Sequence, residues 1–90
     1  MSNYIYQMCT FTYFVSGIFG VDYKFDAFYT SRKKTIEGVE GYVKYLCQKE
    51  NIKSIPIEYK DSSGLNYVMF KIENESKTEY YGYRKHRVNI

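Results

Sequence analysis

The chain has no tryptophan, one proline, one histidine and only two cysteines among its 90 residues. Two cysteines, Cys9 and Cys47, are too few for the disulfide framework of a small secreted domain, so both are interpreted as free, apolar side chains. The single histidine, His86, stands at no metal-ligand spacing from them, and no serine lies in a nucleophile motif. These absences predict a protein that is not an enzyme and that uses no metal and no cofactor.

Long apolar runs are also missing. Charged residues interrupt every candidate before it reaches the roughly 20 residues of a membrane-spanning helix. Residues 1–14 have no basic segment ahead of an apolar core, which argues against a secretory signal. We therefore expect a cytoplasmic protein without membrane contact. The net charge of +3 excludes a strongly acidic imitation of a nucleic-acid backbone.

One segment, residues 35–51, repeats its apolar residues at helical spacing. The apolar stripe consists of Ile36, Val39, Val43, Leu46 and Cys47. We favour Thr35 over Ser31 as the N-cap, because Ser31 would place three cations at the positive end of the helix dipole. Asn51 is expected to cap the other end.

The remaining apolar segments predict strands at residues 4–15, 21–29, 54–60, 66–72 and 78–83. Residues 4–15 are apolar at both parities, which is typical of a central strand. Residues 21–29 alternate, so Val21 and Tyr29 are expected on one face. The strand that contains Pro56 is expected at an edge, because proline cannot donate a ladder hydrogen bond. Short connections between the last three strands are typical of a meander.

The predicted fold class is therefore α+β. We expect one compact domain over residues 1–90, with a mostly antiparallel sheet of about five strands and the element order β-β-α-β-β-β. The amphipathic helix packs on one face of this sheet, because a lone apolar stripe needs a sheet to cover. Residues 84–90 are expected to form a basic C-terminal tail.

Tyrosine is unusually frequent, with 12 residues. An AT-rich genome and the strand preference of aromatic residues are one explanation. The other is a contact surface, because tyrosine offers a large area with little rotamer entropy. Residues on the helix side away from the apolar stripe are predicted to bind a partner: Gly38, Gly41, Tyr42, Tyr45 and Lys49. The apolar pair Ile18 and Phe19 is expected to be either tucked under the sheet edge or exposed for contact.

The general appearance resembles small, AT-rich, single-domain proteins of phages and mobile elements, which often bind and block a host protein. This resemblance concerns size and composition and involves no motif. With no catalytic set and many tyrosines, the sequence predicts a non-enzymatic binding protein whose partner is a protein. In this interpretation it inhibits a host protein, such as a defence protein, through the tyrosine- and glycine-rich helix surface.

Two alternatives remain open. The first is binding of nucleic acid or a nucleotide by two basic clusters and neighbouring tyrosines. The residues concerned are Arg32, Lys33, Lys34, Tyr81, Tyr83, Arg84, Lys85 and Arg87. The second is a self-associating structural protein, a homo-oligomer in which the Pro56 strand or the last strand is an unpaired edge. The basic clusters have a plain explanation too, since a solvated basic surface keeps a small protein soluble.

Overall fold

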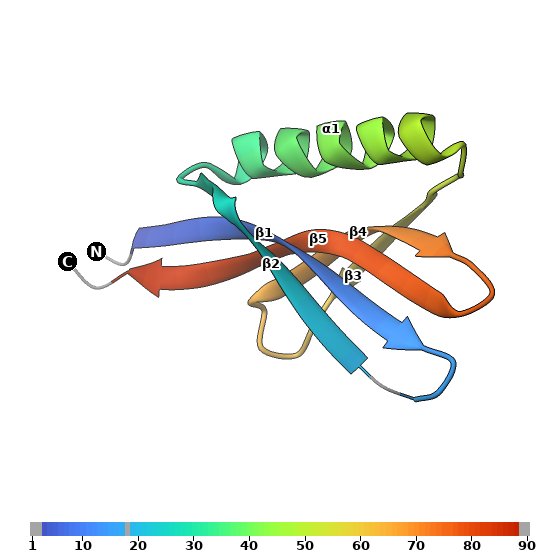
Figure 1. Cartoon of the computed structure of the whole chain (residues 1–90). Coiled ribbons are helices and arrows are strands. Elements are labelled where there is room, and N and C mark those ends of the chain that lie inside the picture. Colours follow the sequence, from blue (N-terminus) through green and yellow to red (C-terminus); the bar gives the residue numbers. More distant parts are fainter. Residues whose placement is uncertain (1–2, 18, 89–90) are drawn as a thin grey trace.

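A computed structural model describes residues 3–17 and 19–88, with side chains for all of these except 3 and 22–27. Within them the elements follow in the order β-β-α-β-β-β, which confirms the predicted order (Figure 1). The elements are β1 (Asn3–Phe14), β2 (Phe19–Tyr29), α1 (Arg32–Glu50), β3 (Ile55–Lys60), β4 (Asn66–Glu73) and β5 (Lys77–Val88).

The five strands form one antiparallel sheet in the order β2-β1-β5-β4-β3. Helix α1 lies along one face of this sheet, against β1, β5 and β2 (Figure 1). The α+β prediction is therefore confirmed. So are the central position of β1, the edge position of β3 and the meander of β3, β4 and β5.

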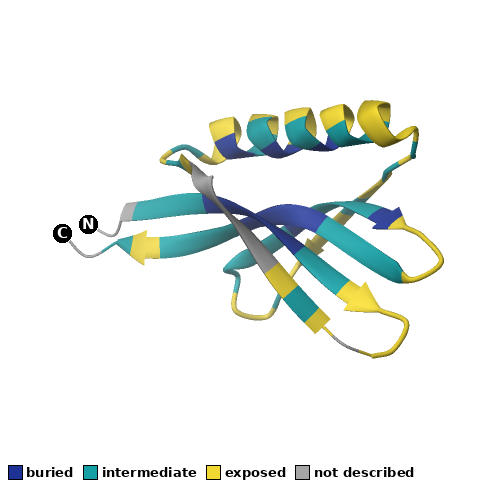
Figure 2. Ribbon diagram, in the orientation of Figure 1, coloured by how far each residue is buried: buried dark blue, intermediate teal, exposed yellow. Residues whose placement is uncertain are grey.

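The core lies between α1 and the sheet. Val39 and Val43 of the helix pack with Met8, Ile72 and Tyr81, and none of the five is more than 6% exposed. Figure 2 shows the buried positions on the side of α1 that faces the sheet. The centre of the predicted apolar stripe is thus confirmed as the core side of the helix. This helix, within the described residues, is not apolar enough to cross a membrane.

The start of α1 differs from the prediction. Ser31 is the N-cap, and its Oγ accepts a hydrogen bond from the backbone N–H of Lys34 at 3.4 Å. Thr35 is fully buried inside the helix, where its hydroxyl donates to the Ser31 carbonyl oxygen at 2.7 Å. Arg32 enters the first turn because its Nε donates to the Tyr83 hydroxyl at 3.0 Å. A contact between distant residues therefore outweighs the unfavourable local charge.

The far end of the helix agrees with the prediction. Asn51 is the C-cap, with a left-handed backbone at φ 53°, and its N–H donates to the Cys47 carbonyl oxygen. Asparagine adopts this conformation at low cost because its short polar side chain bonds locally. The helix therefore ends where the sequence places its end.

The last strand is longer than predicted. β5 runs to Val88, so the basic run 84–87 belongs to a strand where the sequence suggested a tail, and residues 89–90 lie outside the described residues. β5 also lies between β1 and β4, so the expectation that the last strand is an unpaired edge is wrong. Strand β1 pairs with β5 along its whole length, which explains the extension.

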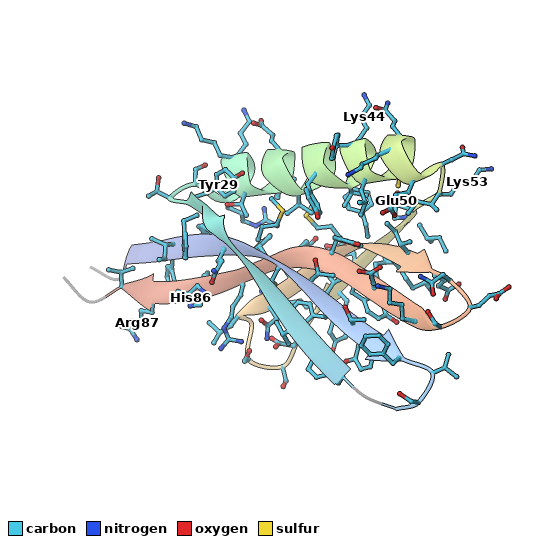
Figure 3. All side chains as sticks on the ribbon, in the orientation of Figure 1. Tyr29, Lys44, Glu50, Lys53, His86 and Arg87 are labelled. Atoms are coloured by element: carbon cyan, nitrogen blue, oxygen red, sulfur yellow. The ribbon has the colours of Figure 1, made fainter. Side chains whose placement is uncertain are left out.

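Pairing registers assign side chains to the two faces of the sheet, since paired residues of antiparallel strands point to the same side. Thr10 pairs with Tyr81 on the helix side, whereas Phe11 pairs with Tyr80 on the other side, here called the open face. Figure 3 shows His86 on the open face and Tyr29 beneath the helix.

The expected alternation of residues 21–29 is not kept. Val21 pairs with Phe11 on the open face, whereas Tyr29 pairs with Tyr6 on the helix side. The two ends of β2 therefore present residues of the same parity to opposite faces. The cause is a register shift opposite Gln7 and Cys9 of β1.

Candidate functional site

A cavity of about 500 Å³ lies on the open face and is called here the aromatic groove. Its lining is formed by Phe11, Tyr13, Phe19, Ile57, Tyr59, Val68 and Tyr80, together with Asp61 and Asn66 where β3 turns into β4. Ligand pockets commonly have volumes of about 300–1,000 Å³ and are lined by apolar side chains with a few polar groups. The groove is therefore the candidate binding site.

Four rings in the groove form one connected cluster. The ring centroids of Tyr13 and Phe19 are 4.8 Å apart, and those of Tyr13 and Tyr80 are 5.6 Å apart at an interplanar angle of 90°. Phe11 stacks on Phe19 at 6.4 Å. The pairing of Tyr13 with Phe19 and of Phe11 with Tyr80 brings these rings together on one face. Such contacts hold the rings in place without covering them.

The rings of the groove remain open to solvent. Tyr13, Phe19 and Tyr59 are 52%, 50% and 58% exposed. Scattered apolar side chains are normal on protein surfaces, whereas a contiguous apolar patch marks a surface that contacts another molecule. For Ile18 and Phe19 the sequence left open whether they are tucked under the sheet edge or exposed for contact. Phe19 is exposed, and Ile18 lies outside the described residues.

Of the side chains that the structure describes, one charged group, that of Asp61, lines the groove. Hydrogen bonds from the Ser63 hydroxyl and the Asn66 side chain lower the pKa of the Asp61 carboxyl to about 2, so the group is ionised at neutral pH. Arg84 donates from Nη1 to the Asn66 side-chain oxygen at 3.2 Å and is not part of the lining. The polar end of the groove is therefore acidic, and the rest is apolar.

The five helix residues predicted to bind a partner do not lie on one exposed surface. Gly41, Tyr45 and Lys49 are exposed, and the Lys49 ammonium lies 5.9 Å from the Tyr45 ring centroid. Tyr42 does not face away from the sheet, because it packs on the core with its ring 6.1 Å from that of Tyr81. Gly38 does not either: a β-carbon there would lie 2.9 Å from Cζ of Tyr29.

The residues of the predicted nucleic-acid site also differ in burial and in the face of the sheet on which they lie. Tyr81 and Tyr83 are only 4% and 5% exposed, so neither offers an open ring face to a base. Arg84 lies on the open face, and the neighbouring Lys85 on the helix side, where its ammonium is 4.4 Å from the Tyr4 ring centroid. The other members of the predicted set are exposed: Arg32, Lys33, Lys34 and Arg87.

Groups with catalytic or metal-binding chemistry are sparse in the described part of the chain. Burial raises the pKa of the Cys9 thiol to about 12, so it stays protonated at neutral pH and is a poor nucleophile. His86 Nε2 lies 3.0 Å from the side-chain oxygen of Gln7. No three side chains of histidine, cysteine, aspartate or glutamate gather at metal-binding distance among the described residues.

Comparison with known proteins adds no assignment. The chain matches no family model, no curated protein and no solved structure. The candidate site therefore rests on its own geometry.

Apart from Phe19, the groove residues were not singled out by the sequence. Two signals point to them in retrospect: residues 4–15 are apolar at both parities, and Ile55, Ile57 and Tyr59 alternate with a proline and two charged residues. Each pattern indicates an apolar face. Neither tells which strands lie side by side, and it is the register that joins the rings of β1, β2 and β5.

Proposed function

We propose that the protein is a non-enzymatic binding protein that blocks a protein partner, and that the aromatic groove is its contact surface. The observation that supports this is the half-exposure of Tyr13, Phe19 and Tyr59 on one face. Covering a further 100 Å² or so of one such ring contributes roughly 2.5 kcal/mol, at about 25 cal/mol per Å² of apolar surface. Three rings together contribute roughly 7.5 kcal/mol, which offsets much of the entropic cost of association, about 4–15 kcal/mol, and the other apolar side chains of the groove add to it.

The proposed occupant is an apolar segment of another protein. Charge supports this choice, because the described side chains that line the groove include no cation and one ionised carboxylate, Asp61. Phosphates of a nucleic acid would meet no positive partner there and would be repelled by Asp61. An apolar segment, with a basic side chain near Asp61, complements both features of the groove.

In this proposal the partner is a host protein and the chain acts as an inhibitor in the cytoplasm. Support comes from the small size, the composition and the absence of a catalytic motif in the sequence. The exposed remainder of the helix surface, Gly41, Tyr45 and Lys49, is a second contact candidate. It offers one half-exposed ring, whereas the groove offers three.

The proposal is tested by affinity capture from host-cell lysate with the wild-type chain and the variant Tyr13→Ser/Phe19→Ser. Both side chains are half exposed, so circular dichroism should show an unchanged fold. The captured protein is identified, purified and mixed again with each chain. Binding by the wild type and its loss in the variant support the proposal, whereas equal binding by both contradicts it.

Sedimentation equilibrium separates a protein partner from a second copy of the chain. We expect a monomer across the concentration range. A dimer that dissociates in the Tyr13→Ser/Phe19→Ser variant would show that the groove is covered by a second copy, which would overturn the proposed inhibitor and favour the self-associating alternative.

A further inference from the structure

A second cavity, of about 100 Å³, lies on the helix side of the sheet, across from the aromatic groove. Three cationic side chains from three elements line it together with tyrosine phenols: Arg32, Lys60, Lys85, Tyr6, Tyr67 and Tyr83. The strand register brings them together, because Tyr6 pairs with Lys85 and Lys60 pairs with Tyr67. We call this space the cationic cavity.

Positive charge in the cationic cavity is not balanced by any carboxylate of the described part of the chain. Among the residues whose side chains the structure describes, no carboxylate lines it, and Arg32, Lys60 and Lys85 form no ion pair. Glu58 accepts a hydrogen bond from the Tyr67 hydroxyl at 3.1 Å and keeps its negative charge, but it does not line the cavity and forms no ion pair with its three cations. Like charges that line one small cavity repel one another. An anion placed between them attracts each of them and offsets this repulsion.

Arg32 is held in a fixed orientation. Its Nε donates to the Tyr83 hydroxyl at 3.0 Å, and its guanidinium carbon lies 5.6 Å from the Tyr67 ring centroid. Its two Nη groups have no acceptor among the described residues. A guanidinium fixed through Nε presents the remaining N–H groups as a fork for two oxygens of one anion.

Hydroxyl donors complete the lining. The Tyr83 oxygen accepts from Arg32, so the Tyr83 proton is available for another acceptor. The Tyr6 hydroxyl has no partner among the described residues and also lines the cavity. Three cations and two hydroxyl donors therefore surround a space large enough for one phosphate group.

We propose that the cationic cavity binds a phosphate monoester group. A phosphate monoester carries a charge close to −2 at neutral pH and three terminal acceptor oxygens, which match several cations and donors at once. A carboxylate carries one charge and two oxygens and leaves part of the lining unsatisfied. The site lies on the side of the sheet opposite the aromatic groove, so its test is independent of the proposed partner.

The test is a backbone NMR titration of the full chain with sodium phosphate above neutral pH, with ionic strength held constant by sodium chloride. We expect saturable shifts of the amides of Gly64 and Lys85. Arg32→Gln and Lys60→Gln should each weaken binding about tenfold, because each removes a charge-assisted hydrogen bond. Lys60→Gln alters an exposed strand residue, so it remains informative if loss of the Arg32–Tyr83 bond loosens the fold.

The matched control is Lys34→Gln, which removes the same charge from an exposed residue of the same helix turn outside the cavity. It should change the affinity less than twofold. Equal weakening by Lys34→Gln would mean diffuse attraction to a basic surface and would overturn the proposal. So would an absence of saturable shifts.

The source of the phosphate is distinguished by adenosine 5′-monophosphate and adenosine. Tighter binding of the monophosphate than of inorganic phosphate would identify a nucleotide, and equal binding would show that recognition ends at the phosphate. Both results support the site. Adenosine binding as tightly as its monophosphate would contradict it, because the phosphate would then contribute nothing.

Discussion

A β-carbon on Gly82 of β5 would stand 2.8 Å from the carbonyl carbon of Tyr67 on β4, closer than packed atoms tolerate. Only glycine therefore fits at this position of the central strand. The close approach accompanies a bulge of β4, whose register shifts between Val68 and Phe70. Because Val68 pairs with Gly82 and lines the aromatic groove, this contact also sets the floor of the groove.

Gly82→Ala should lower the free energy of unfolding by about 3 kcal/mol or more, because the obstacle is backbone and cannot rotate away. Urea denaturation measures the effect. Gly20→Ala on β2 is the control, since a β-carbon there meets nothing within 4 Å. A loss as small as that of the control would show that β4 moves away from β5 at little cost.

Two helix glycines should respond differently to alanine. Gly41 faces open space, so Gly41→Ala should raise the unfolding free energy by up to about 1 kcal/mol through helix propensity alone. At Gly38 the new β-carbon would lie 2.9 Å from Cζ of Tyr29, so the phenol must leave the helix surface. Gly38→Ala should therefore be less stable than Gly41→Ala by about 1 kcal/mol, by thermal or urea denaturation. Equal stability of the two variants would contradict the close contact between Gly38 and the Tyr29 ring.

Two helix tyrosines should differ in their contribution to stability, because one lies in the core and the other on the surface. Tyr42 packs on the core, so Tyr42→Ala should cost about 2–4 kcal/mol of unfolding free energy. Tyr45 is 58% exposed, and Tyr45→Ala should change it by less than about 0.5 kcal/mol. Similar losses for both, measured by urea denaturation, would place the helix in a different rotation on the sheet.

Much of the fold could be predicted because its signals are local. The apolar stripe around Val39 and Val43, the alternation of the strands and the turn residues between them establish the element order. Pro56 marks the edge strand, since it cannot donate to a neighbour. Asn51 marks the helix end because asparagine readily adopts the left-handed backbone conformation of a C-cap.

What could not be predicted depends on residues far apart in the sequence. The helix starts at Arg32 because Tyr83, 51 residues later, accepts its hydrogen bond. The basic run 84–87 has no strand pattern of its own, and it forms a strand because β1 pairs with it. The aromatic groove has the same origin: Tyr13, Phe19 and Tyr80 meet only through the sheet register, which short-range patterns do not contain.

Acid should weaken the turn between β3 and β4. The folded-state pKa of Asp61 is about 2, below its ordinary value of 3.8, so its contribution to stability is complete above pH 3.8 and is lost as the pH falls through 2. We expect the wild type to be more stable than Asp61→Asn at neutral pH. This difference in unfolding free energy should shrink as the pH falls from 3.8 towards 2. A difference that stays constant over this range, by urea denaturation at several pH values, would contradict the hydrogen-bonded carboxylate.

The most direct test of the aromatic groove compares two tyrosines of equal exposure. Tyr59 in the groove and Tyr45 on the outer side of α1 are both 58% exposed, so Tyr59→Ser and Tyr45→Ser remove the same ring from different surfaces. Calorimetry with the purified partner gives the dissociation constant of each variant. We predict that Tyr59→Ser weakens binding about tenfold or more, while Tyr45→Ser stays within about twofold of the wild type. The opposite order, or equal effects, would contradict the groove as the contact surface.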